Sequence, residues 1–197
     1  MQMADQVALV NGEGQRVAQV TAALEKRGVL VRSGETLEEL VSLCDGLADE
    51  SVDLYVQLPT SVEAHGSSVV ARVRNFLSDG LIARFDAAGT VMPKLARGAS
   101  VVLASGNHPA DTSAPDNQRA RMALLHVLGS AMIMERPDDE LSVTIVDHLH
   151  GPDELAAIAL EPSAARIRVL SDFAEASPEL DWGDWRNELL ALTTTET

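Results

Sequence analysis

Residues 99–134 open with the apolar run Val101-Val102-Leu103-Ala104, which Ser105 and Gly106 follow. A run this short, rich in branched side chains and closed by glycine, predicts a strand that is buried on both faces. A polar loop over 107–115 comes next, and a helix with an apolar stripe is expected over 117–134, capped by Asp116 or Asn117. In open α/β folds ligands bind beyond the carboxyl ends of the strands, so we expect any working site at this loop.

The rest of the chain repeats this order of strand and helix. Thr36 with Glu39 predicts a capping box, and a helix from Ser67 to about Phe85 is expected to continue to Leu95, with an interruption near Gly89 or Pro93. The alternation predicts an α/β fold with one domain, a shortened Rossmann-like parallel sheet with helices on both faces. It is expected over 1–175, and 176–197 is expected to be an acidic, partly disordered tail. The strands are expected at 7–10, 29–31, 52–58, 101–104, 141–146 and 167–170, and the other helices at 15–27, 36–49 and 153–159.

Composition excludes several classes of function. The net charge is −15, which argues against nucleic acid and against an anionic membrane surface as partners. The chain has one cysteine, Cys44, so an internal disulfide framework and a cysteine metal cluster are excluded. No stretch has the length of a membrane span and the first residues do not resemble a signal peptide, so we expect a cytoplasmic protein.

Four segments, Val52–Val56, Gly80–Leu95, Val101–Ser105 and 117–125, follow one another in an order that resembles the short-chain dehydrogenase/reductase (SDR) family. The first is similar to the family's Ile-Asp-x-Leu-Val strand. The second and third resemble the helix, Pro-x-Leu turn and strand that lead to its catalytic serine. The fourth resembles its Tyr-x-x-x-Lys helix. The resemblance covers about residues 7–170 and rests on spacing more than on identity.

The resemblance implies a catalytic site whose residues are mostly replaced. The serine corresponds to Ser105 and the asparagine falls near Gly80, while the tyrosine and lysine positions hold Asn117 and Arg121. An amide has no acidic proton to give to a carbonyl, and Arg121 retains only a positive charge. We therefore expect no intact catalytic set, with Gly80, Ser105, Asn117 and Arg121 as vestigial positions.

The cofactor turn of the family, Thr-Gly-x-x-x-Gly-x-Gly, is also incomplete here. Asn11 and Gly12 fit its first two positions, but its later glycines fall near Arg16, where a side chain should obstruct a dinucleotide. Gly14 relieves this partly if the turn is one residue shorter. We therefore expect no intact cofactor-binding site at Asn11, Gly12 and Gly14 and no cofactor in this chain. Between the strands at 29–31 and 52–58 there is room for one helix only.

Histidines offer three weaker candidates. Asp147, His148, His150 and Asp153 have the residue types of a metal site, but they lack a second paired ligand motif, so we favour an ordinary polar loop and predict no metal. His108 is an alternative acid or base beside the expected site. His126 is expected to be a core or interface residue, and Trp182 and Trp185 in the tail pack either on a neighbouring subunit or on their own domain.

Family members commonly pair through the two helices that correspond here to about Ser67–Leu95 and Asn117–Met134. The favoured hypothesis is therefore a degenerate subunit that assembles with an intact SDR, which binds NAD(P), in an alcohol or hydroxyacyl dehydrogenase complex. One alternative is an active NAD(P)-dependent oxidoreductase that uses Ser105, His108 and Arg121. Another is a regulatory module that binds a small ligand on its own. The apolar stripes expected to mediate pairing are Ala71, Leu81 and Ala88 on the first helix and Ala120, Leu124, Leu128 and Ala131 on the second.

Overall fold

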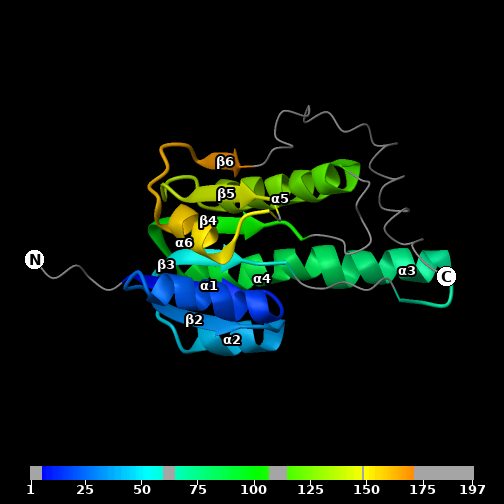
Figure 1. Cartoon of the computed structure of the whole chain (residues 1–197), viewed down its shortest axis with the longest axis horizontal. Helices are drawn as coiled ribbons and strands as arrows, with labels where there is room; N and C mark the ends of the chain where they lie inside the picture. Colours follow the sequence, from blue (N-terminus) through cyan, green and yellow to red (C-terminus); the bar gives the residue numbers. More distant parts are fainter. Residues whose placement is uncertain (1–5, 60–64, 107–114, 148, 171–197) are drawn as a thin grey trace, which may run out of the picture.

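The computed structural model describes residues 6–59, 65–106, 115–147 and 149–170, and they form one six-stranded parallel sheet with helices on both faces (Figure 1). The strand order is β2-β1-β3-β4-β5-β6. The expected α/β fold, a shortened Rossmann-like sheet, is confirmed. The elements are β1 (Val7–Asn11), α1 (Gln15–Glu25), β2 (Leu30–Gly34), α2 (Leu37–Asp45), β3 (Val52–Gln57), α3 (Val69–Phe76), η1 (Leu77–Ile82), α4 (Ala83–Val91), η2 (Met92–Lys94), β4 (Leu95–Ala104), α5 (Pro115–Glu135), β5 (Ser142–Val146), α6 (Pro152–Leu160) and β6 (Ile167–Leu170).

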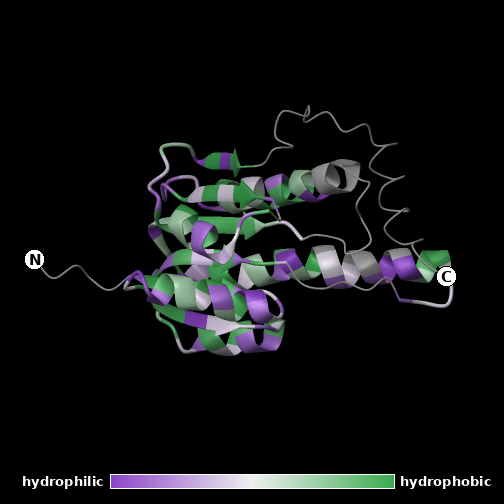
Figure 2. Ribbon diagram, in the orientation of Figure 1, coloured by the Kyte–Doolittle hydropathy of each residue, from purple (hydrophilic) through white to green (hydrophobic). Residues whose placement is uncertain are grey.

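Two apolar layers hold the sheet between its helices. Successive strand residues, such as Leu9 and Val10, point to opposite faces of the sheet and belong to different apolar layers. The strands are apolar along most of their length (Figure 2). One layer packs under α2, α4 and α5, and the other packs under α1 and α6. Cys44 belongs to the first layer and is buried and free, as its helical spacing predicted. Within the described ranges, no helix is both long and apolar enough to cross a membrane.

The connection between β2 and β3 holds α2 alone, as the short spacing predicted. The predicted capping box is present at its start. The Thr36 hydroxyl accepts from the Glu39 N–H at 3.1 Å, and the Glu39 carboxylate accepts from the Thr36 N–H at 3.3 Å. The helix ends at Asp45, four residues before the expected end.

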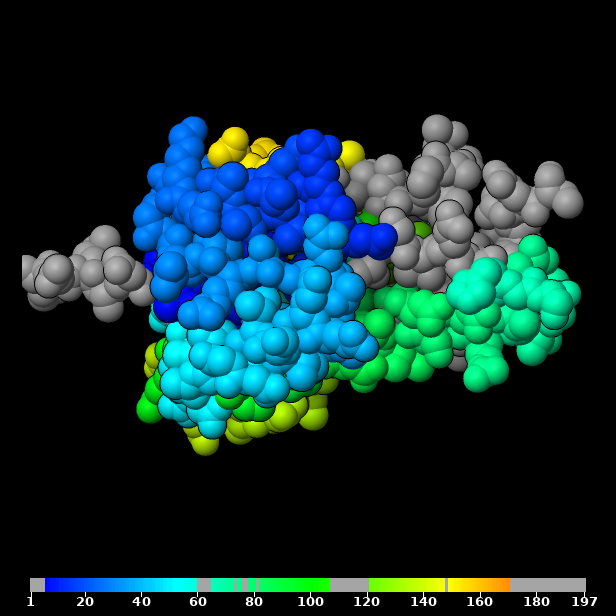
Figure 3. Space-filling model, turned by 90° about the horizontal axis from the view of Figure 1, so that it is seen from below, coloured from blue at the N-terminus to red at the C-terminus, as the bar shows by residue number. Residues whose placement is uncertain are grey.

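The long helical segment that leads to β4 is interrupted at Pro93, one of the two places expected, and also at a place that was not expected. Gly89 lies inside α4 without a break, while a π-helical segment, η1, surrounds Gly80. A second change of geometry, the 3₁₀ turn η2, falls at Pro93, as expected. A π segment widens a helix by one residue per turn and re-aims the side chains that follow it. Figure 3 shows α3 projecting beyond the body of the described molecule.

Two element boundaries correct the sequence interpretation. Strand β4 begins at Leu95 and passes through Gly98, which takes φ +76°, whereas the strand was expected to begin after this glycine. Its pairing with β3 shifts register between Val52 and Leu54, so the glycine accommodates an irregularity and does not end the strand. Helix α5 begins at Pro115, so Asp116 and Asn117 lie inside its first turn and are not caps. The predicted tail at 176–197, with Trp182 and Trp185, lies outside the described residues.

Candidate functional site

Four neighbouring strands each lead into a buried polar residue at the same edge of the sheet. Asn11 and Gln57 are the last residues of β1 and β3, and Ser105 and Asp147 directly follow β4 and β5. Each of these residues is less than a tenth exposed. Because all the strands are parallel, their carboxyl ends meet at one edge, which is where open α/β folds bind ligands. This carboxyl edge is therefore the candidate site.

A chain of hydrogen bonds joins the ends of β1 and β3. The Tyr55 hydroxyl donates to the Asn11 side-chain oxygen at 2.7 Å, and the Gln57 side-chain amide donates to the Tyr55 oxygen at 3.1 Å. Burial raises the pKa of the Tyr55 phenol above its usual range, and the hydrogen bond from Gln57 opposes this only in part. Tyr55 lies inside a strand, as the sequence indicated, and its hydroxyl is committed to this network.

Arg84 extends the network to the end of β4. Its Nε donates to the Gln57 side-chain oxygen at 2.9 Å, and its Nη2 donates to the Ala104 carbonyl at 2.9 Å and to the Gln57 carbonyl at 3.4 Å. Burial lowers the pKa of Arg84 to about 10; the nearby Tyr55 raises it and the positive charge of Arg121 lowers it further. Sequence reasoning missed Arg84, although it lies one helical turn after Gly80.

Ser105 and Arg121 meet at the same edge. Ser105 is fully buried, and its N–H donates to the Val146 carbonyl at 2.9 Å. A Cβ placed on Gly106 would lie 3.1 Å from the Arg121 Nη1, so the missing side chain admits this guanidinium next to Gly106. Gly80 is buried in η1. Asn117 belongs to the backbone of α5, but its side chain lies outside the description.

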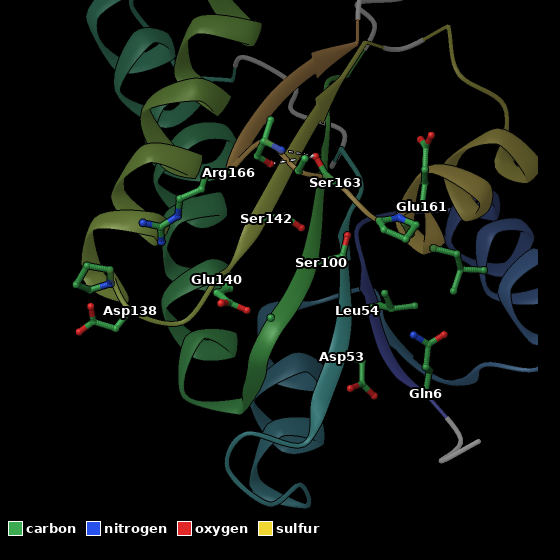
Figure 4. Close-up of a pocket in the computed structure, with 17 residues that line it drawn as sticks. Gln6, Asp53, Leu54, Ser100, Asp138, Glu140, Ser142, Glu161, Ser163 and Arg166 are labelled. Carbon is green, nitrogen blue, oxygen red and sulfur yellow. Dashed lines mark hydrogen bonds between the residues drawn. The ribbon is translucent and has the colours of Figure 1, made fainter. Parts of the chain in front are cut away.

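A groove of about 620 Å³ lies at the opposite edge of the sheet (Figure 4). Its floor includes Leu54, Ser100 and Ser142, which are direct neighbours across β3, β4 and β5. Ala159 and Leu160 at the end of α6 also line it, because this helix of nine residues stops short of the sheet's amino edge. None of the groove residues belongs to the carboxyl-edge network. This groove and the carboxyl-edge network therefore lie at opposite edges of the sheet.

Comparison with solved structures shows which proteins share this architecture. A small-chain dehydrogenase aligns over 88% of this chain and 99% of its own, with a TM-score of 0.60 and 15% identity. A short-chain dehydrogenase/reductase from Serratia marcescens aligns over 84% of this chain and 96% of its own, with a TM-score of 0.60 and 11% identity. The chain has the SDR fold. No family model and no curated protein matches the sequence, and at these identities the SDR likeness shows the fold alone.

The turn after β1 differs from the glycine-lined turn that a dinucleotide needs. Gly12 takes φ +147°, and a Cβ placed there would lie 2.5 Å from the Leu58 Cβ, so the turn is packed against the chain that follows β3. Gly14 precedes α1 and provides no side-chain cap. Arg16, in the first turn of α1, is half-buried and donates from Nη2 to the His150 carbonyl at 2.6 Å. This side chain spans from the helix start, where the pyrophosphate of a dinucleotide is held, to the β5–α6 loop.

The histidine candidates are dispersed. His150 Nδ1 lies 2.9 Å from the Asp147 carboxylate, which also accepts from the Leu149 N–H. Asp153 instead forms an ion pair with Arg27 at 3.2 Å. No group of three potential metal ligands occurs among the described residues, and His108 and His148 lie outside them. His126 is exposed on α5, so the expectation of a core histidine is wrong and an interface role stays a prediction.

Proposed function

We propose that this chain is a non-catalytic SDR-like subunit of a hetero-oligomeric, NAD(P)-dependent alcohol or hydroxyacyl dehydrogenase. In this proposal the partner is an intact SDR, it binds NAD(P), and it contacts this chain through the helical segments at about 67–95 and 117–134. Hydride transfer takes place on the partner. This chain stabilises or shapes the partner's site and carries no cofactor or metal of its own. The complex is cytoplasmic.

The distribution of exposed apolar side chains carries the proposal. Ten large apolar side chains are exposed in the described residues, and six of them lie on the two segments proposed for pairing. Val127 is 57% exposed and Met134 is 78% exposed, both on α5. Exposed apolar surface gathered on one part of a molecule is typical of an interface with another subunit. Besides Val127 and Met134, the exposed large apolar side chains on the two segments are Val69, Val70, Ile82 and Phe85.

The residues proposed for pairing differ in part from the stripes read from the sequence. Ala88 and Leu128 are buried in the layer under α4 and α5, so they belong to the chain's own core. The exposed residues with helical spacing are Ile82 and Phe85 on one segment and Val127, Ala131 and Met134 on the other. The stripe was misjudged because residues that face the core and residues that face a partner are both small and apolar.

The carboxyl edge supports a non-catalytic role. The only tyrosine of the chain is held in a buried network, and burial raises its pKa, which is the opposite of what a phenolic proton donor at neutral pH requires. Arg16 spans the helix start at which a dinucleotide is held. Both features are consistent with loss of hydride transfer in this chain.

The test is assembly in the native host. We expect the tagged chain to co-purify by size exclusion with one stoichiometric, intact SDR, identified by mass spectrometry, and we expect dehydrogenase activity of the partner to depend on the chain. A homodimer of this chain with no SDR in the same peak would refute the proposal. Titration of that homodimer with NAD and NADP would then separate an unusual oxidoreductase from a module that binds another ligand.

A matched pair of variants locates the interface. Val127→Glu places a charge on α5 at a side chain that is 57% exposed, and we expect it to abolish co-purification with the partner. Leu30→Glu makes the same change at a side chain that is 54% exposed on the edge strand β2, and we expect the complex to persist. Equal behaviour of the two variants would place the interface elsewhere.

A further inference from the structure

We propose that the groove at the amino edge of the sheet binds a small organic cation that carries a primary ammonium group. The groove has a volume of about 620 Å³, which is typical of small-molecule sites (Figure 4). Volume alone does not identify a ligand, and the proposal rests on the charges, the hydroxyl groups and the helix end that line the groove. It is independent of subunit pairing, because no residue that lines the groove belongs to the segments proposed for pairing.

Carboxylates dominate the charged side chains of the groove. Four carboxylates and one guanidinium line it. The guanidinium of Arg166 donates from Nη2 to the Arg136 carbonyl at 3.2 Å, so it points to the end of α5 and away from the groove floor (Figure 4). The electrostatic potential in the groove is therefore negative, which favours a cation over an anion or a neutral molecule. The four carboxylates belong to Asp53, Asp138, Glu140 and Glu161.

The Glu140 carboxylate is the one we expect to contact the ammonium group. Its side chain is exposed, and its carboxylate forms no ion pair or hydrogen bond with any described residue. By contrast, Glu161 accepts from the Arg168 Nη1 at 2.9 Å, and Asp53 accepts from the Val7 N–H at 2.8 Å. The groove therefore holds more negative charge than its own side chains neutralise.

Two serines on the floor of the groove offer acceptors to the same group. Ser100 and Ser142 are direct neighbours across β4 and β5, and both are partly exposed (Figure 4). Their hydroxyls form no hydrogen bond with any described residue. The next residues on this face of the sheet, Val102 and Thr144, are buried. An ammonium group has three N–H donors and no acceptor, so two hydroxyl oxygens and a carboxylate satisfy it.

The end of α6 adds a negative partial charge. A helix carries about half a negative elementary charge at its carboxyl end, where the last carbonyls have no partner within the helix. Ala159 and Leu160, the last two residues of α6, line the groove, and the last turn of this helix has no basic residue that compensates the charge. A cation in the groove would supply the compensating charge.

The test measures binding of a simple amine to the isolated, full-length chain. Butylamine is titrated at constant ionic strength while the heat of binding and the melting temperature are followed. Butanol has the same length without the charge, and tetramethylammonium has the same charge without N–H donors. We expect butylamine to bind in the millimolar range and to raise the melting temperature, and we expect no comparable effect of butanol or tetramethylammonium.

Two variants and a control link the binding to these residues. Glu140→Gln keeps the size of the side chain and removes its charge, and we expect the affinity for butylamine to fall about fivefold, as for an exposed ion pair. Ser142→Ala removes one acceptor, and we expect the affinity to fall about threefold. Glu38→Gln makes the same change of charge at an exposed position in the first turn of α2, outside the groove, and should leave the affinity unchanged. Circular dichroism checks that all three variants are folded.

The proposal is overturned if butylamine does not bind the wild-type chain, if butanol or tetramethylammonium binds as tightly, or if either Glu140→Gln or Ser142→Ala binds butylamine as tightly as Glu38→Gln. None of these results bears on subunit pairing, which is measured by co-purification. Conversely, a chain that binds butylamine but pairs with no SDR would retain this site and lose the proposed subunit role.

Discussion

The two edges of the sheet differ in what they do with polar residues. At the carboxyl edge, Asn11, Gln57 and Ser105 are buried, and Tyr55 and Arg84 join the first two in a hydrogen-bonded network. At the amino edge, the groove is lined by polar residues such as Ser100 and Ser142, which are partly exposed. Burying a polar group costs free energy unless it is paired, so a chain that buries several of them has specified their positions.

The comparison teaches that a hollow is weaker evidence for a site than a paired polar network. The amino-edge groove follows from the short helix α6, which leaves the sheet uncovered beyond Leu160. The carboxyl-edge network follows from residues placed at the ends of separate strands, far apart in the sequence. If this distinction is correct, substitutions at the carboxyl edge should destabilise the fold, whereas similar substitutions at the amino edge should not.

The largest effect is expected at Arg84. Arg84→Met keeps the apolar stem but removes three hydrogen bonds and leaves Gln57 and the Ala104 carbonyl without their donor. We expect the free energy of unfolding to fall by about 4 kcal/mol, because buried groups that lose a charged partner are costly. Urea denaturation measures this, with Arg32→Met on the exposed edge strand as the control, expected within about 0.5 kcal/mol of the wild type. Equal midpoints for the two variants would contradict a structural role for the network.

The second effect concerns the turn after β1. Gly12→Ala would place a Cβ 2.5 Å from the Leu58 Cβ at φ +147°, so both a steric clash and backbone strain oppose it. We expect a loss of about 3 kcal/mol in unfolding free energy. Gly89→Ala is the matched control, since no atom lies within 4 Å of its Cβ and it is inside α4. This control should gain about 0.5 kcal/mol from helix propensity, so a loss of similar size in both variants would contradict the packing of the turn.

The third effect compares the two edges directly. Tyr55→Phe removes one hydroxyl, so the Asn11 oxygen loses this donor and the Gln57 amide keeps only its hydrogen bond to the Arg84 carbonyl. We expect a loss of about 2 kcal/mol in unfolding free energy. Ser142→Ala also removes one hydroxyl, but from a partly exposed position in the groove, and should change stability by about 0.5 kcal/mol at most. Thermal denaturation of both variants measures the difference, and a larger loss for Ser142→Ala would reverse the comparison.

Local patterns predicted the fold but not the network. Branched apolar runs such as Val101–Ala104 and the Thr36–Glu39 capping box act over a few residues, so the sheet and its helices could be read from the sequence. The site residues Ser105 and Arg121 came from a resemblance of spacing. Arg84 could not be predicted, because its partners lie 20 and 27 residues away and the π segment that precedes it has no clear sequence signal. An arginine in an amphipathic helix is normally assigned to the solvent.

The smallest effect at neutral pH, and the most specific to the network, is the ionisation of Tyr55. Burial raises the pKa of Tyr55 in the folded chain above the ordinary value of about 10, which holds in the unfolded chain. The folded chain therefore retains this proton where the unfolded chain loses it, so the group's contribution to stability is fully present below pH of about 10 and is lost as the pH rises further. Because Tyr55 is the only tyrosine, phenolate absorbance reports it alone, and Tyr55→Phe should give no signal. We expect phenolate to form together with the loss of circular dichroism. Reversible ionisation near the ordinary pKa in a chain that stays folded would mean that the phenol is open to solvent and that the network at the carboxyl edge does not hold it.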